Sequence, residues 1–211
     1  MFGIENYTGF LAAAIILNLT PGADTFYILT RSIAQGPRAG LVSVAGIMSG
    51  CVVHVLGAAF GLSLILSTSA TAFFLVKWAG ALYLIFLGVK ALTSRNPAFE
   101  TRDNRFSNKD LITIYRQGMI TNILNPKVGL FFLSFLPQFI NPEHAAGPLP
   151  FLALGGTFLV TGTLWCLVLT RTATRMTRML RENAGIGMWM QKLSGIIFIG
   201  FGVSLAFNSR G

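Results

Sequence analysis

The stretch that decides the fold reads Asn18-Leu19-Thr20-Pro21-Gly22-Ala23-Asp24, and it interrupts an apolar run from Phe10 to Leu29. Pro21 cannot donate a backbone hydrogen bond, so it leaves the carbonyl of Leu17 without its helical partner. In hydrocarbon, a freed backbone group persists only where protein or trapped water satisfies it. An ionised Asp24 near mid-membrane adds a cost of roughly 2.5–3.5 kcal/mol on insertion scales. A sequence that accepts both costs at one place predicts a functional site there.

The composition is that of an integral membrane protein. Of the 211 residues, 53% are hydrophobic and 11% are charged, and the mean hydropathy is +0.66. A soluble domain carries about a quarter charged residues. The two cysteines, Cys51 and Cys166, lie in apolar stretches without metal-ligand spacing, and we interpret them as small packing residues.

Six apolar stretches each have about the 20 residues that a ~30 Å hydrocarbon core requires. They predict an all-α, multi-pass protein in which residues 1–211 form a single polytopic membrane domain. The predicted transmembrane helices cover residues 7–29, 41–66, 71–92, 113–140, 149–170 and 189–208.

Basic residues gather on one side of these spans. The connections at 67–70 and 141–150 contain no Lys or Arg. Because basic loops stay in the cytoplasm, we expect both termini outside and a cytoplasmic linker over about 94–112. The net charge of +9 therefore indicates topology and no nucleic-acid partner. Most of the 16 Lys and Arg residues lie in or beside the connections after the first, third and fifth spans: Arg31, Arg38, Lys90, Arg95, Arg102, Arg105, Lys109, Arg116, Arg171, Arg175, Arg178, Arg181 and Lys192.

The chain divides into two halves of three spans each, about 1–93 and 113–211. An odd number of spans per half inserts the second half upside down, which predicts a 3+3 inverted repeat, a design of many secondary transporters. The fourth span contains a second break, Asn122-Ile123-Leu124-Asn125-Pro126-Lys127. Pro126 frees the carbonyl of Asn122, as Pro21 frees that of Leu17. We expect the first and fourth helices to be broken at these prolines, near the membrane midplane.

Asp24 and Lys127 follow the two prolines and carry opposite charges. One interpretation is a buried ion pair that joins the two halves. The other is that the two side chains, together or separately, meet a zwitterion or a proton, because an amino acid offers the matching ammonium and carboxylate groups. The sequence does not decide whether they touch.

Gly46, Gly50 and His54 fall at four-residue spacing on one face of the second span, and Gly57 and Gly61 repeat this spacing. Gly46, Gly50, Gly57 and Gly61 predict close helix packing, since small residues let backbones approach. His54 has two interpretations, a structural hydrogen bond to a neighbouring helix or a role with substrate or protons.

The chain resembles the lysine exporter and homoserine–threonine resistance (LysE/RhtB) family of amino-acid exporters. Pro21-Gly22 matches the family's proline-glycine-proline motif, although Ala23 stands where the second proline is expected. The resemblance covers nearly the full length. It rests most on Gly118, Thr121-Asn122-Ile123-Leu124-Asn125-Pro126-Lys127, Phe131-Phe132 and Phe135-Leu136-Pro137-Gln138-Phe139, with further matches at Arg38-Ala39-Gly40-Leu41, Gly80–Leu84, Leu87–Lys90 and Leu193-Ser194-Gly195.

This resemblance implies export of amino acids or their derivatives across the bacterial cytoplasmic (inner) membrane, driven by the proton motive force. We expect a secondary active exporter with alternating access, a small amino-acid substrate, protons as the coupling ion and no cofactor. A passive pore for small solutes is the alternative, since broken half-helices also line pores. Motifs of an enzyme are absent, and whether the chain forms a homo-oligomer stays open. The predicted substrate-binding and transport residues are Asn18, Pro21, Gly22, Asp24, His54, Asn122, Asn125, Pro126 and Lys127, with no catalytic or metal-binding residue among them.

Overall fold

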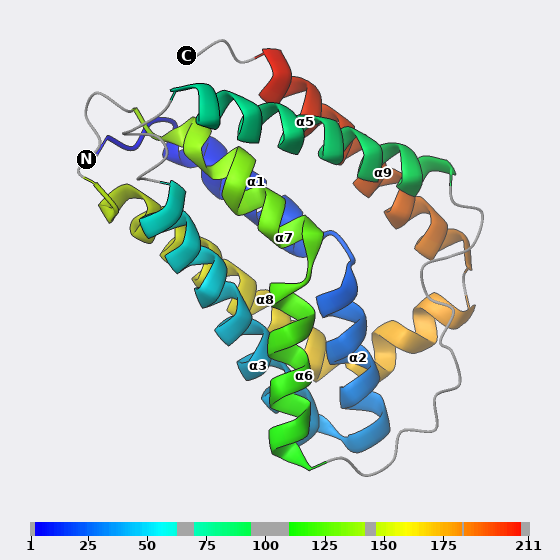
Figure 1. Cartoon of the computed structure of the whole chain (residues 1–211). Coiled ribbons are helices and arrows are strands. Elements are labelled where there is room, and N and C mark those ends of the chain that lie inside the picture. The colour runs from blue at the N-terminus through cyan, green and yellow to red at the C-terminus, as the bar shows by residue number, and fades with distance from the viewer. Residues whose placement is uncertain (1–2, 63–69, 94–109, 142–146, 183, 208–211) are drawn as a thin grey trace.

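The computed structural model describes residues 3–62, 70–93, 110–141, 147–182 and 184–207, and in this part of the chain all regular structure is helical. An isolated antiparallel bridge between Ile4 and Ile140 is the one extended pairing there. The elements (Figure 1) are α1 (Tyr7–Leu19), α2 (Ala23–Gln35), α3 (Pro37–Leu56), the π-helix η1 (Gly57–Leu62), α5 (Ala70–Thr93), α6 (Leu111–Ile123), α7 (Pro126–Leu130), the π-helix η2 (Phe131–Phe135), the 3₁₀ helix η3 (Leu136–Phe139), α8 (Leu149–Glu182) and α9 (Ala184–Phe207).

Two segments among the described residues, Pro37–Gly61 and Leu149–Arg175, are long and apolar enough to cross a membrane. Two bent pairs meet the same standard if each pair is one span: α1 with α2, and α6 with Pro126–Phe139. α5 and α9 coincide in sequence with the predicted spans 71–92 and 189–208. The all-helical prediction is confirmed for the described residues, while the six-span count and the 3+3 repeat stay predictions.

The connection predicted between the first two spans has the wrong boundaries. Arg31 lies inside α2, where its side chain is 3% exposed, and Arg38 lies in the first turn of α3. Gly36 alone separates these helices, with a φ of 84° that glycine adopts without steric cost. α2 continues this far because the Arg31 guanidinium finds partners inside the bundle, donating to Gln35 at 2.8 Å and to Gln117 at 2.7 Å.

The connection predicted between the fifth and sixth spans is mostly helical, since α8 continues to Glu182 and α9 begins at Ala184. The other connections behind the predicted orientation, at 67–69, 94–109 and 142–146, lie outside the described residues. The outward location of both termini therefore stays a prediction.

Both predicted helix breaks are present. The chain bends by 48° between α1 and α2, and by 46° between α6 and the helical segment that follows it. At the first break the backbone N–H of Thr20 donates to the carbonyl of Leu17 at 3.2 Å and ends α1. At the second, the side chain of Asn125 accepts from the backbone N–H of Lys127 at 3.1 Å and caps α7. A proline next to a residue that satisfies the free backbone groups produces each bend.

α3 and α6 lie side by side (Figure 1) because two glycines let their backbones approach closely. A Cβ atom at Gly46 would collide with the carbonyl oxygen of Tyr115, and one at Gly50 would lie 2.6 Å from a carbonyl oxygen of α6. Gly57 and Gly61 have no such neighbour within 4 Å among the described residues. The predicted packing role is confirmed for the first two glycines, whereas the other two, which follow the end of α3, pack against no described residue.

Replacing Gly50 by alanine should lower the free energy of unfolding by about 1–3 kcal/mol, because the new methyl group overpacks the α3–α6 contact. The midpoint of thermal unfolding in detergent measures this loss. Gly57→Ala is the matched control and should change stability by less than about 0.5 kcal/mol. Equal effects of the two substitutions would contradict this account of the interface.

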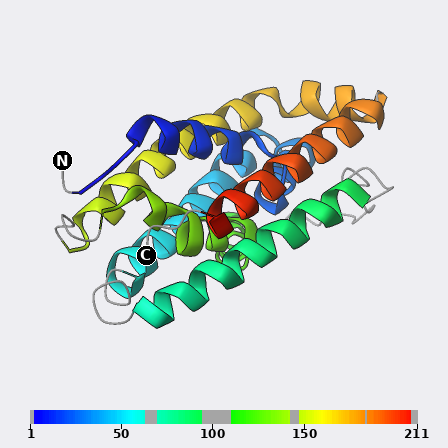
Figure 2. The same ribbon diagram turned by 90° about the horizontal axis from the view of Figure 1, so that it is seen from above.

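α5 and α9 pack against each other along one side of the bundle (Figures 1 and 2). Their backbones approach through Gly88 of α5 and Gly195 and Gly202 of α9, where added Cβ atoms would lie 2.6–2.8 Å from carbonyl oxygens of the opposite helix. This pair flanks the helices that carry the two breaks.

Two hydrophobic clusters fill the bundle. The larger contains phenylalanines of α1, η2, η3 and α8, among them Phe10, Phe131 and Phe158, and the Phe131 ring centroid lies 5.8 Å from that of Phe10 and 4.9 Å from that of Phe158. The smaller joins α2, α3 and α8 through residues such as Ile28 and Ile47. Side chains of both clusters line one small polar cavity, so the cavity lies where the two clusters meet.

Candidate functional site

Asp24, in the first turn of α2, is held by the break in the other half of the chain. Its Oδ2 accepts hydrogen bonds from the side-chain amides of Asn122 at 2.9 Å and Asn125 at 3.0 Å. Both asparagines are buried, at 2% and 4% exposed. Two amide donors stabilise a carboxylate in a place where water is scarce.

Lys127, at the start of α7, makes the reciprocal contact with the first break. Its Nζ donates to the carbonyl oxygens of Leu17 at 3.2 Å and Thr20 at 2.8 Å. The Leu17 carbonyl is the one that Pro21 frees, so a cation from the second half compensates the loss in the first. Gly22 leaves room for this contact, since a Cβ atom there would lie 3.2 Å from Nζ.

No ion pair within 4.0 Å joins Asp24 to Lys127, although both are among the described residues. Each instead bonds to groups of the opposite break, and both line the same cavity. The structure therefore favours the interpretation in which the two charges are separate. Two sets of hydrogen bonds, one at each charge, join the two halves.

His54 of α3 lies beside the second break and bonds to the carbonyl that Pro126 frees. Its Nε2 lies 3.0 Å from the carbonyl oxygen of Asn122, a distance at which the ring nitrogen donates. The His54 ring also stacks on Phe132, with ring centroids 6.1 Å apart. The structural hydrogen bond that the sequence left as one of two interpretations is present.

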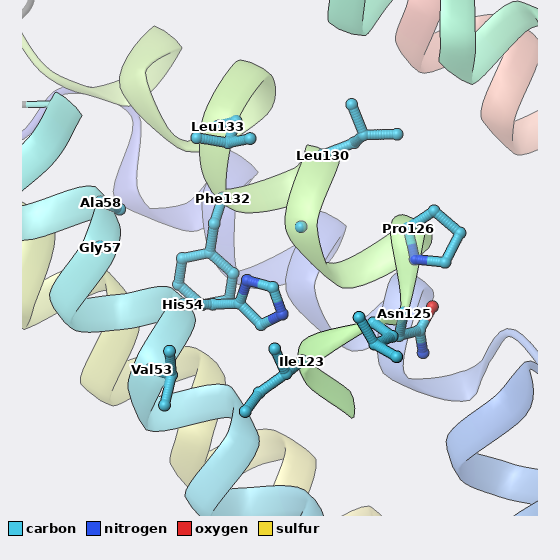
Figure 3. Close-up of a pocket in the computed structure, with 12 residues that line it drawn as sticks. Val53, His54, Gly57, Ala58, Ile123, Asn125, Pro126, Leu130, Phe132 and Leu133 are labelled. Carbon is cyan, nitrogen blue, oxygen red and sulfur yellow. The ribbon is translucent and has the colours of Figure 1, made fainter. Parts of the chain in front are cut away.

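An open pocket of about 420 Å³ lies between α3, η1 and the second break (Figure 3). His54, Asn125 and Pro126 line it, and the other lining side chains are apolar. In the close-up, the His54 and Phe132 rings lie side by side within it. This pocket lies outside the polar cavity that Asp24 and Lys127 share.

The central cavity is small, about 30 Å³, and lies among α1, α2, α3, α6, α7 and α8. Four of the predicted site residues line it: Asn18, Asp24, Asn122 and Lys127. Three buried polar side-chain atoms of this lining have no hydrogen-bond partner in the described part of the chain, namely Oδ1 of Asp24, Oδ1 of Asn122 and Nε1 of Trp165. Buried polar groups almost always find partners, so the three atoms mark a place for a polar group.

The other predicted site residues lie around this cavity. Pro21 and Gly22 form the first break, whereas His54, Asn125 and Pro126 line the larger pocket on the other side of the second break. The structure thus brings the predicted residues to the two breaks, where seven of the nine line two different cavities and Pro21 and Gly22 line neither.

Two α8 residues at the site were not among the predicted site residues. Trp165 lines the central cavity, and Thr161 accepts a hydrogen bond from Asn18 at 3.0 Å while donating to its own backbone. From the sequence, Thr161 could either line a polar path or bond to its own backbone. A tryptophan in an apolar span carries no signal of its depth. Their positions follow only from how α8 packs on α1 and α2.

A polar contact between α2 and α6 was also missed. Arg31 donates to Gln117, its guanidinium carbon lies 5.4 Å from the ring centroid of Tyr27, and the Tyr27 hydroxyl donates to the carbonyl of Ile114 at 2.7 Å. One signal was available, because Arg31 stands one turn after Tyr27 on the same helix face.

Apolar helices long enough to span a membrane, two of them broken around a buried polar cavity, define a helical membrane protein with an enclosed polar site. The sequence pattern of one protein family, described as LysE type translocator, matches residues 15–209. The chain belongs to this LysE family and is a membrane transport protein, not an enzyme.

Similar proteins are found over almost the whole chain. A leucine efflux protein of Klebsiella pneumoniae is 30% identical over 97% of this chain and 96% of its own length. A membrane protein of Vibrio cholerae is 30% identical over 96% of this chain and 97% of its own. A leucine efflux protein of Salmonella typhimurium is 27% identical, with 97% and 96% covered. No solved structure matches the chain.

Proposed function

We propose that the protein is a secondary active exporter of neutral amino acids, with leucine as the first substrate to test. The observation that carries the proposal is the mutual bracing of the two breaks, Asp24 by two asparagines of the second half and Lys127 by two carbonyls of the first. Paired broken helices with a polar site between them are a design of secondary transporters. The names of two relatives, leucine efflux protein, support the substrate class.

The lining of the central cavity supports a substrate with a polar head and an apolar side chain. Asp24 and Asn122 offer oxygen atoms, whereas Met48, Val128 and Phe158 offer apolar surface. A carboxylate placed among such groups suits the ammonium of an amino acid, or a coupling proton.

Alternating access supplies the mechanism in this proposal. A cavity of about 30 Å³ holds no more than about one water molecule, so the described conformation is closed around it. In this proposal the six spans form a 3+3 inverted repeat. Movement of one half against the other would expose the site to the two sides of the inner membrane in turn. The hydrophobic clusters on the two sides of the cavity disfavour the passive pore.

Amino-acid efflux from proteoliposomes tests the proposal. Purified protein is reconstituted with labelled leucine, lysine, threonine and methionine, with and without an imposed proton gradient. Saturable efflux of leucine that the gradient accelerates would support a coupled exporter. Equal, non-saturating leakage of all four would instead establish a pore, and no movement of any would refute amino-acid export.

His54 should act through its hydrogen bond and not as a proton carrier. His54→Gln keeps a donor for the Asn122 carbonyl, so it should retain leucine efflux with the wild-type pH dependence. His54→Leu removes the donor and should lower the free energy of unfolding by about 1–3 kcal/mol. A flat pH profile in a stable His54→Gln protein would show that the imidazole itself titrates during transport.

A further inference from the structure

Three unpartnered atoms of the central cavity differ in what they can bind. Oδ1 of Asp24 and Oδ1 of Asn122 accept hydrogen bonds, whereas Nε1 of Trp165 only donates. The orientation of the Asn122 amide follows from its neighbours, because its nitrogen already donates to the other oxygen of Asp24. At 2% exposure, Asn122 cannot turn its oxygen toward bulk water.

The combination of two acceptors and one donor matches the two charged ends of an amino acid. An ammonium group donates and can bridge the two oxygens, and a carboxylate accepts and can take the indole N–H of Trp165. Asp24 and Asn122 come from different halves, on α2 and α6, and Trp165 comes from α8. The three residues therefore line one cavity from three helices.

Lys127 is less suited to the carboxylate than its charge indicates. Two of the three donors of its ammonium are used by the carbonyls of Leu17 and Thr20, and leaving them would uncover the freed backbone of the first break. Nε1 of Trp165, in contrast, has no hydrogen-bond partner among the described residues.

We propose that the substrate's ammonium binds between Oδ1 of Asp24 and Oδ1 of Asn122, that its carboxylate accepts from Nε1 of Trp165, and that Lys127 is a positioning residue. This assignment rests on the proposed function. The cavity of about 30 Å³ receives the polar head only after the halves separate enough to widen it. A single water molecule, with two donors and an acceptor, offers the same complement, so the test must distinguish the two.

The test compares leucine with two analogues that each lack one charged group. 3-Methylbutylamine lacks the carboxylate, and 4-methylpentanoate lacks the ammonium. Competition against labelled leucine on purified protein in detergent gives an inhibition constant for each compound, in the wild type and in Trp165→Phe. The substitution removes the indole N–H and keeps an aromatic ring.

Trp165→Phe should weaken the binding of leucine and of 4-methylpentanoate by about 10-fold or more, which is the effect of losing one hydrogen bond to a charged group. The inhibition constant of 3-methylbutylamine should change by less than about twofold, because that compound has no carboxylate. Equal weakening of all three, or of none, would overturn the assignment and indicate a structural contact with water. A wild-type protein that binds none of leucine, threonine and methionine would instead refute the proposed function.

A second measurement keeps Trp165 intact, in case the substitution disturbs folding. The other two tryptophans, Trp78 and Trp189, are 39% and 65% exposed, so both can be replaced by phenylalanine. Leucine should then change the emission of the one remaining indole, whereas 3-methylbutylamine at a saturating concentration should change it little. The same change with both compounds would overturn the carboxylate contact.

Discussion

Replacing Asp24 by asparagine should reduce gradient-driven leucine export at least about 100-fold while leaving a folded protein. Asparagine has almost the same shape and retains an oxygen that can accept from Asn122 and Asn125, which hold the carboxylate at 2.9 and 3.0 Å. It loses the charge that would receive an ammonium or a proton. In a site that excludes water, an interaction between charges of opposite sign is worth several times its value at the surface.

Efflux from proteoliposomes measures the loss, and exchange of leucine without a proton gradient shows which step fails. If exchange persists while gradient-driven efflux is lost, Asp24 carries the coupling proton. If both are lost, it holds the ammonium. Asp110→Asn neutralises an acidic residue at the start of α6, outside the two breaks, and should export normally. Wild-type export by Asp24→Asn, with unchanged pH dependence, would show that the carboxylate has neither role.

The positions of the breaks could be predicted from the sequence because their causes are local. Pro21 and Pro126 remove backbone hydrogen bonds wherever they stand in a helix, and an apolar run around a proline leaves few other ways to satisfy the chain. The structure bends at both places, by 48° and 46°. The identity of the groups that satisfy the freed carbonyls was not local, since Lys127 bonds across more than 100 residues of sequence to Leu17.

The partners of the buried charges could not be predicted from the sequence. Asp24 and Lys127 have opposite signs, which left a direct ion pair open as one of two interpretations, yet amides and carbonyls of the opposite break bind each of them. Arg31 was assigned to the connection after a first span that was predicted to end at residue 29, whereas Gln117 and the Tyr27 ring stabilise it inside the bundle. Sequence patterns give the cost of burying a charge and do not reveal the partner that offsets it.

In the proposed transport cycle, two different kinds of contact would have to separate. The phenylalanines of the larger cluster pack against each other, whereas Arg31 and Tyr27 join α2 to α6 through Gln117 and the carbonyl of Ile114. Separating the first contacts would expose apolar rings, and separating the second would exchange hydrogen bonds with water. The two sets of contacts would therefore respond differently to solvent.

Lys127→Met should lower both stability and export. The loss of affinity should be the same for ligands with and without a carboxylate. Methionine has a similar length and cannot donate, so the hydrogen bonds to the carbonyls of Leu17 and Thr20 are lost. Hydrogen bonds to charged groups contribute about 1.5–3 kcal/mol each. The free energy of unfolding should fall by about 3–6 kcal/mol, with a lower midpoint of thermal unfolding in detergent.

The ratio of leucine to 3-methylbutylamine affinity separates positioning from direct contact. If Lys127 only maintains the shape of the first break, Lys127→Met lowers the affinity for both compounds by the same factor. If the Lys127 ammonium binds the carboxylate, only the affinity for leucine falls, and the assignment of the carboxylate to Trp165 fails. Lys90→Met removes an exposed lysine of α5 and should change neither stability nor the ratio. A stable Lys127→Met protein with wild-type export would mean that the first break needs no cation from the second half.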